Sequence, residues 1–143
     1  MDWAGASFEY EKALALSPSN QQTKFSLASM KALQGQLTEA VKLSGDAIAS
    51  DPLQPNWWNW YSAYLSGLGR IDDAEAAVGK SIALRPQGSS TWAQLAIIEI
   101  QRGDAWETNA TLYYAMQFYV RRYDLGVAQV DTGPRLTISN AAG

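Results

Sequence analysis

The sequence predicts an all-α fold of stacked antiparallel helix pairs, because short features recur along it every 34 residues. Self-similarity at a fixed period of roughly 20–50 residues is typical of helical repeat proteins. Apolar residues within each copy follow helical spacing, and glycine or proline separates the helical stretches. The residues that repeat in phase are the prolines Pro18, Pro52 and Pro86, the alanines Ala6, Ala40 and Ala74, the glycines Gly35, Gly69 and Gly103, and the tryptophans Trp58 and Trp92.

Composition excludes several classes of function. The chain has 143 residues, a net charge of −3 and neither cysteine nor histidine, so it cannot build a thiolate nucleophile, a Cys or His zinc site or a Ser–His dyad. Arg121-Arg122 is the only adjacent basic pair, whereas a nucleic-acid surface needs clustered Lys and Arg. No membrane-spanning run or secretory signal is apparent. We therefore expect no enzyme activity, cofactor, metal, nucleic-acid partner or membrane partner, and a cytoplasmic location.

The first predicted helix belongs to a half-unit, residues 1–18. Asp2 can cap it, and it ends before Pro18 because the residue preceding a proline is driven out of the α region. By repeat phase this is the second helix of a unit, and Met1 stands where the other units have their turn glycine. We expect the chain to be cut from a longer array, with a lone N-terminal capping helix as the alternative.

Three further units are expected at residues 21–54, 55–88 and 89–122. In each unit a glycine ends the first helix, since glycine adopts the left-handed C′ conformation without a Cβ penalty. The second helices are expected to begin near Thr38 and Asp72.

The third unit departs from the pattern. Thr108 and Val120 replace the repeated alanine and proline, so its second helix is expected to run on to about residue 123. We expect residues 1–123 to form the repeat domain. Residues 124–143 lack helical spacing, and an irregular or partly ordered tail is expected there.

These units resemble tetratricopeptide repeats over about residues 2–120. The middle unit fills the family's pattern with Trp58, Tyr61, Ser62, Leu65, Ala74, Val78, Ser81 and Pro86. Lys24, Lys31 and Glu99 stand at apolar or aromatic places of the pattern, so weaker contacts are expected there. The resemblance implies a right-handed superhelix, an α-solenoid, whose first helices line a concave, protein-binding face. More weakly, the chain is similar to the C-terminal repeat arrays of bacterial signalling and regulatory proteins.

Two groups of residues invite a functional interpretation on composition alone. The first is aromatic and consists of Trp57, Trp58, Trp60, Tyr61 and Tyr64. Tryptophan and tyrosine are enriched in binding hot spots, but aromatic stripes at helical spacing usually belong to a core. We expect most of these rings to pack between helices, with one or two partly exposed. The second group is acidic (Asp72, Asp73 and Glu75), and we interpret it as helix capping rather than as a metal or acid–base site.

The better candidate for binding is the small polar face that the resemblance places on the concave side. Because this groove is nearly uncharged, we expect it to hold a partly apolar or amide-rich peptide of a protein partner. Only Asn59 is present from the basic clamp that some family members use for a terminal carboxylate. The alternative is a groove that holds water or a neighbouring segment of the parent chain. The predicted site comprises Gln22, Phe25, Ser29, Asn56, Asn59, Ala63, Ser66, Ser90, Ala93, Ile97, Ile100 and Gln101.

Two other functions stay open from the sequence. Trp106, Tyr114 and Phe118 fall on the outward face of the last predicted helix, where an end repeat normally carries polar residues. That face predicts self-association, as a homodimer through the C-terminal helix. The chain is otherwise interpreted as a regulatory array of a larger signalling or transcription protein.

Overall fold

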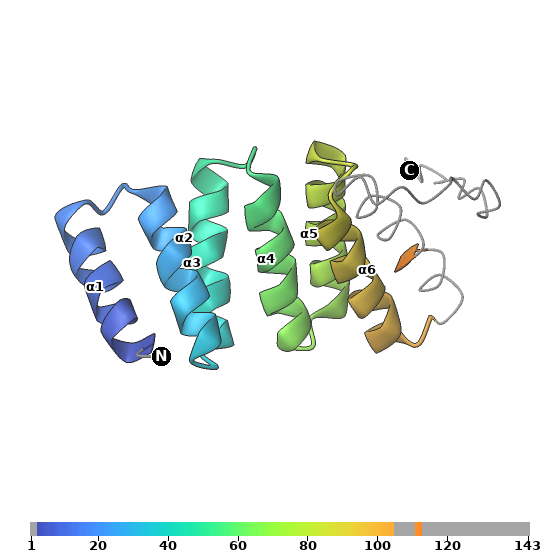
Figure 1. The fold of residues 1–143 in the computed structure, drawn as a ribbon, viewed down its shortest axis with the longest axis horizontal. Helices are drawn as coiled ribbons and strands as arrows, with labels where there is room; N and C mark the ends of the chain where they lie inside the picture. The colour runs from blue at the N-terminus through green and yellow to red at the C-terminus, as the bar shows by residue number, and fades with distance from the viewer. Residues whose placement is uncertain (1–2, 105–110, 113–143) are drawn as a thin grey trace, which may run out of the picture. The chain divides into compact units, whose positions relative to one another are not determined.

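The computed structural model describes residues 3–104 and 111–112, and all secondary structure within these ranges is α-helical (Figure 1). The helices are α1 (Trp3–Leu16), α2 (Gln21–Leu33), α3 (Leu37–Ser50), α4 (Pro55–Gly67), α5 (Ile71–Leu84) and α6 (Ser89–Arg102). No helix among the described residues has the length and apolar character needed to cross a membrane. The chain divides into two compact units after Pro86, so α1–α5 belong to the first unit and α6 to the second.

Tight glycine turns end the first helix of each predicted unit. Gly35, Gly69 and Gly103 have φ angles of 78°, 75° and 92°, a left-handed conformation in which a side chain would be strained. The N–H of Gln36 donates to the Lys31 carbonyl at 2.9 Å, and the N–H of Arg70 donates to the Leu65 carbonyl at 3.0 Å. These bonds satisfy carbonyls that the helix end leaves free. The predicted glycine turns are confirmed.

Prolines follow the C-terminal ends of the second helices, and acidic residues occupy the first turn of α5. Helices α3 and α5 have their C-caps at Asp51 and Arg85, each immediately before a proline. Asp72 and Asp73 occupy the first turn of α5, and the Asp73 carboxylate pairs with Arg70 at 2.7 Å. The capping interpretation of these acids agrees with that placement, because negative charge is favoured at a helix N-terminus.

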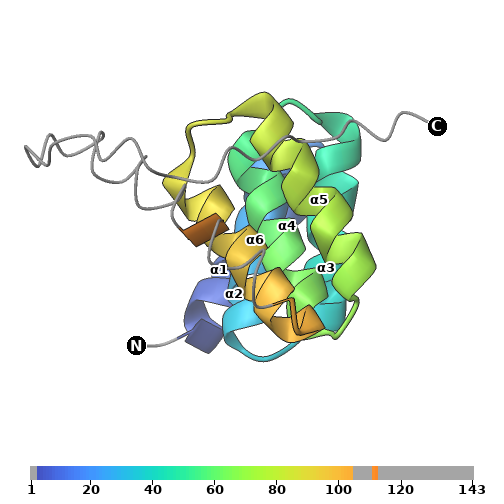
Figure 2. The same ribbon diagram turned by 90° about the vertical axis from the view of Figure 1, so that its right-hand side faces the viewer.

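Within the first unit, α2 packs on α3, α4 packs on α5, and α3 joins the two pairs by packing on α4. Figure 2 shows α2 and α4 in one layer and α3 and α5 in another. The faces in contact are made of small residues: Ala28, Ala40, Ala47 and Ala74 are all 0% exposed. Small side chains let helix axes approach closely, and the larger Leu65 and Val78 fill the space between them.

Buried serines bond to backbone carbonyls across these seams. The Ser62 hydroxyl of α4 donates to the Ala74 carbonyl of α5 at 2.9 Å, and Ser81 of α5 donates to the Pro55 carbonyl at 2.7 Å. Both serines are fully buried. Each hydroxyl therefore keeps a partner where an unpaired polar group would cost about 1–3 kcal/mol. The two bonds fix the relative positions of α4 and α5.

Helix α1 is held to α2 by polar contacts. The Lys31 ammonium lies 2.8 Å from Glu11 of α1 and 3.9 Å from Glu39 of α3. The hydrogen bond with Glu11 raises the pKa of Lys31 above its usual value. Gln34 also donates to the Ser7 hydroxyl at 2.8 Å. Lys31, which stands at an apolar place of the repeat pattern, thus gains an ionic role in joining successive helices.

Several predictions fall outside the described residues. They are the second helix of the third unit apart from residues 111–112, the tail at 124–143, and the self-association face of Trp106, Tyr114 and Phe118. In the second unit, the Thr111 hydroxyl donates to the Glu99 carboxylate at 2.9 Å, although Glu99 occupies an apolar place of the repeat pattern.

The close helix contact at Ala74 predicts a sharp response to substitution. Ala74→Leu forces a larger side chain into a seam with no free space and should lower the free energy of unfolding by about 1–3 kcal/mol. Ala83→Leu is the matched control, because Ala83 is exposed on the same helix and should stay within about 0.5 kcal/mol of wild type. Urea unfolding followed by circular dichroism measures both. Equal losses in the two variants would contradict the tight seam.

Candidate functional site

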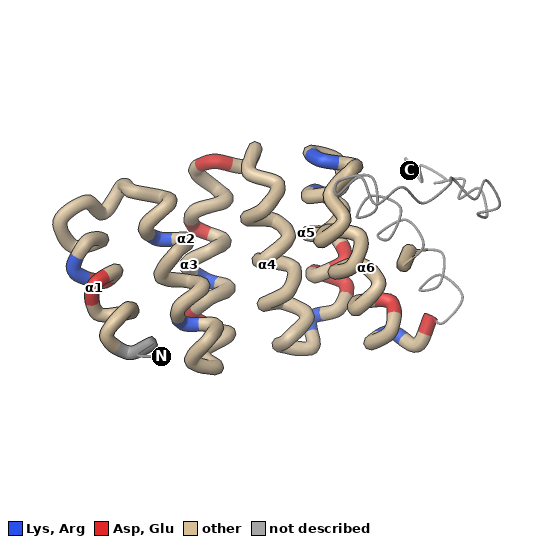
Figure 3. The backbone as a smooth tube through the Cα atoms, viewed as in Figure 1, with Lys and Arg blue, Asp and Glu red and all other residues tan. Residues whose placement is uncertain are grey.

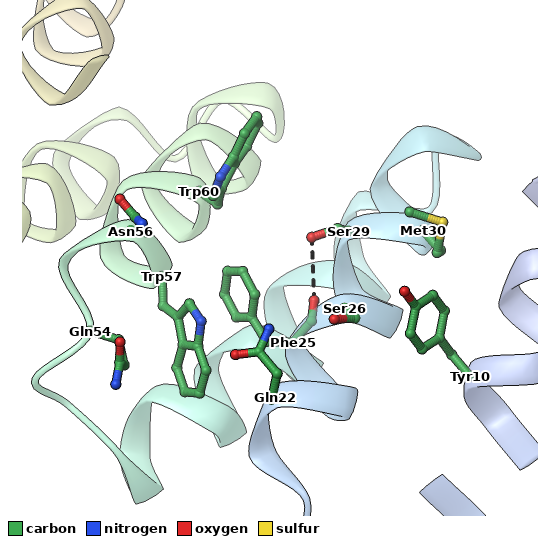
Figure 4. A pocket seen from close by; sticks show the side chains of 10 residues that line it. All are labelled: Tyr10, Gln22, Phe25, Ser26, Ser29, Met30, Gln54, Asn56, Trp57 and Trp60. Carbon is green, nitrogen blue, oxygen red and sulfur yellow. Dashed lines mark hydrogen bonds between the residues drawn. The ribbon is translucent and has the colours of Figure 1, made fainter. Parts of the chain in front are cut away.

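A hollow of about 400 Å³ opens between α2 and α4 and is bordered by α1 (Figure 4). Its volume lies within the range of roughly 300–1,000 Å³ that is usual for ligand sites. The side chains that line it are mainly aromatic, amide or hydroxyl-bearing, and none carries a charge. They are Tyr10, Gln22, Phe25, Ser26, Ser29, Met30, Gln54, Asn56, Trp57 and Trp60.

The base of the hollow is a pair of stacked rings. Phe25 of α2 and Trp57 of α4 have ring centroids 5.0 Å apart and planes inclined by 10°. Both side chains are buried, at 5% and 7% exposure, and they pack with Ala47 and Ile48 of α3. Such a pair contributes about 0.5–1.5 kcal/mol beyond the area that it buries. The stack therefore holds the two walls of the hollow at a fixed separation.

A hydrogen bond joins the same two helices nearby. The hydroxyls of Ser29 and Tyr64 lie 3.0 Å apart. Either hydroxyl can donate in this contact, and the Ser29 hydroxyl can also donate to the Phe25 carbonyl at 3.3 Å. Burial raises the pKa of the Tyr64 phenol, and the bond to Ser29 opposes that shift only partly. Tyr64 therefore stays protonated to a higher pH than an ordinary tyrosine, because its pKa is raised.

The rim carries groups that a ligand could reach. Trp60 is 54% exposed and stacks on Tyr64 with a centroid separation of 6.5 Å. The Asn56 amide oxygen accepts a hydrogen bond from Arg85, so its NH₂ group is the end left for a ligand. Gln54 donates to Asp51 at 2.8 Å. Gln22 is exposed, and its amide has no hydrogen-bond partner within the described residues.

The region is electrically neutral along its whole α4 wall. Figure 3 shows α4 without a single basic or acidic residue between Pro55 and Gly67, whereas its neighbours carry both. The described part of the chain also holds no group of three or more Asp or Glu residues placed to bind a metal ion. A neutral surface of rings and amides selects ligands by shape and hydrogen bonding rather than by charge.

The hollow contains four of the predicted site residues: Gln22, Phe25, Ser29 and Asn56. Three others on α4 do not line it: Asn59, Ala63 and Ser66. Ser66 is buried, and the Asn59 amide oxygen is buried without a hydrogen-bond partner in the described range. The remaining predicted residues lie on α6 in the second unit, where Ile97 and Ile100 are 48% and 60% exposed. These α6 positions are Ser90, Ala93, Ile97, Ile100 and Gln101.

Six lining residues escaped the sequence prediction. Tyr10 is not among the predicted residues because it lies on a second helix, whereas the predicted concave face is made of first helices. Trp57 and Trp60 were assigned to the core with the other rings of α4. For most of that cluster the assignment is confirmed, since Trp57 and Tyr64 are buried and Trp60 alone is largely exposed. Gln54, Trp57 and Trp60 share a signal in the sequence, because they are spaced three residues apart and so fall on one side of α4. The other missed residues are Ser26, Met30 and Gln54.

The fold defines the chain as a helical repeat protein of the α-solenoid class. Structures of the protein MamA share this fold at low sequence identity. One, from MSR-1, matches with a TM-score of 0.74 at 21% identity, covering 84% of this chain and 69% of that chain. Another, residues 41 to the end of MamA from Desulfovibrio magneticus RS-1, matches with a TM-score of 0.79 at 15% identity, covering 85% and 68%. No protein-family model and no curated protein matches the sequence.

The raised pKa of Tyr64 predicts a stability change in alkali. The folded protein holds the phenol protonated, so stability is complete below the unfolded value of 10.0 and falls as pH rises through the higher folded value. Tyr64→Phe removes this ionisation, so the stability gap between wild type and variant should shrink as pH rises above 10.0. Urea midpoints of both proteins over that range measure the gap. A gap that stays constant would contradict the buried, protonated phenol.

Proposed function

We propose that this chain is a non-enzymatic, tetratricopeptide-type scaffold that binds a segment of a partner protein in the hollow between α2 and α4. The observation that carries the proposal is a concave site with an aromatic base and with amide NH₂ groups at its rim that are free to donate. Phe25 and Trp57 form the base, and Gln22, Asn56 and Trp60 lie at the rim. Such a combination provides an apolar contact surface together with the few directional groups that orient a peptide backbone.

The energetics of the site favour binding. The ring stack and the Ser29–Tyr64 hydrogen bond already fix the walls, so little conformational freedom remains to be lost when a ligand enters. Trp60 offers a large flat surface that is half exposed, and tryptophan is one of the residue types enriched in binding hot spots. A second hollow of about 220 Å³ lies between α4 and α5. We do not propose it as the binding site, because Arg70 and Asp73 on its border are paired with each other.

The regulatory-array and self-association hypotheses stay predictions. The face that would support self-association, Trp106, Tyr114 and Phe118, lies outside the described residues.

A phage-displayed library of short random peptides tests the proposal. Selection on the wild-type chain should enrich peptides that bind wild type and lose at least about 1 kcal/mol of binding free energy on Trp60→Ala, the threshold that marks an important contact. Phe8→Ala is the matched control, because Phe8 is 59% exposed on α1 and does not line the hollow. It should leave binding unchanged.

Both variants remove an exposed ring, so both should fold, which circular dichroism verifies. Failure to enrich any peptide would contradict the proposal. So would a set of peptides that bind wild type, Trp60→Ala and Phe8→Ala with equal affinity.

A further inference from the structure

We infer that the segment bound between α2 and α4 is an uncharged, proline-containing stretch in the polyproline II conformation. The inference rests on the proposed function and specifies the class of ligand. Peptide recognition uses a small number of modes: strand addition, helix-in-groove docking, polyproline II recognition, capture of acidic or phosphorylated motifs, and capture of a chain terminus. The residues of the hollow are compatible with one of them.

Charge removes two of these modes. Acidic and phosphorylated motifs are bound by Arg or Lys, and none of the ten lining residues is charged, so a terminal carboxylate gains no ionic partner there either. Arg85 is not among the lining residues, and it donates to the Asn56 amide oxygen. An N-terminal amine would require carboxylates, which are also absent from the lining. A charged ligand would therefore lose its hydration without gaining a partner.

Shape and backbone chemistry remove two more. Strand addition needs the free edge of a sheet, and the walls of the hollow are helices whose backbone groups bond internally. An amphipathic helix needs a continuous apolar groove for its i, i+3, i+4 and i+7 side chains. Here amides and hydroxyls from Gln22, Ser26, Ser29 and Asn56 interrupt the aromatic surface.

Polyproline II recognition is the one mode of the five that the hollow fits. A polyproline II segment has no internal hydrogen bonds, so its carbonyls seek donors, and it loses little entropy on binding because it is already extended. The hollow presents rings from two helices, Tyr10 of α1 and Trp57 and Trp60 of α4 (Figure 4), and of these Tyr10 and Trp60 are exposed enough for a ligand to cover. Polar groups lie among these rings, with the Gln22 amide and the Asn56 NH₂ group available as donors. Proline rings would pack on the aromatic faces while the carbonyls between them accept these hydrogen bonds.

Isothermal titration calorimetry on the full chain with three blocked peptides of equal length tests the inference. The peptides are polyproline, an uncharged glycine–serine sequence, and a sequence that alternates proline with glutamate. We expect polyproline to bind, the glycine–serine peptide to show no heat of binding, and the glutamate-containing peptide to bind more weakly than polyproline. Trp60→Ala should weaken polyproline binding by at least about fivefold, the equivalent of 1 kcal/mol at a binding hot spot, whereas Phe8→Ala should leave it unchanged.

Each other outcome overturns the inference. Absence of polyproline binding, equal binding of the glycine–serine or glutamate peptide, or an equal effect of Trp60→Ala and Phe8→Ala would do so. The phage selection separates this failure from failure of the proposed function. If it enriches peptides that depend on Trp60 but contain no proline, the hollow is a peptide site of a different specificity. If it enriches none, the proposed function fails as well.

Discussion

The contact between Phe25 and Trp57 is the interaction on which the candidate site depends. These rings come from the first helices of two successive repeats, stack at 5.0 Å, and are buried against α3. Because one ring lies on α2 and the other in the first turn of α4, their contact sets the distance between the helices that form the walls. Without it the Ser29–Tyr64 hydrogen bond and the packing of α3 on both helices would be left to hold the walls, and a ligand would have to order the rim groups to a greater extent on binding.

The helices that carry this contact pack closely on the helices behind them, α3 and α5. Alanines fill the α2–α3 and α4–α5 seams, and Ser62 and Ser81 bond to backbone carbonyls across the second seam. Ser81 bonds to the carbonyl of Pro55, the first residue of α4, so it positions the turn that carries Trp57. The small residues lie in the seams between paired helices, and the large rings lie between α2 and α4. The first allow close approach, and the second fill the space that remains.

The 34-residue period predicted the helices well because the features that start and stop helices are local. Gly35 and Gly69 need only their own φ angles to end a helix, and Pro55 only its own ring to suit a first turn. The residues that line the hollow were harder to predict, because a side chain lines it only where the side chains of other helices do not cover it. Trp57 and Trp60 lie on one helical arc, yet Trp57 is 7% exposed and Trp60 54%. Trp57 is covered by Phe25 of α2 and by Ala47 and Ile48 of α3, and no pattern within α4 encodes those contacts.

The neutral character of the site was visible in the sequence, whereas the role of Lys31 was not. An uncharged α4 follows directly from its composition. A lysine at an apolar place of the repeat predicts a weakened contact, but Glu11 and Glu39 approach it from two other helices and turn it into a link between α1 and α2. Such compensation depends on residues 20 and 8 positions away, so it appears only once the helices are placed.

The most direct measurement of the central claim is the movement of tryptophan indole N–H signals in nitrogen-15 NMR when blocked polyproline is added. The signals are assigned by single Trp→Phe substitutions. Trp57 and Trp60 line the hollow, so their signals should shift together along one saturable curve. Trp58 should not respond, because its indole donates to the Pro52 carbonyl at 2.8 Å and does not line the hollow. A response of Trp58 with Trp57 and Trp60 unmoved, or no response from any of the three, would contradict the account.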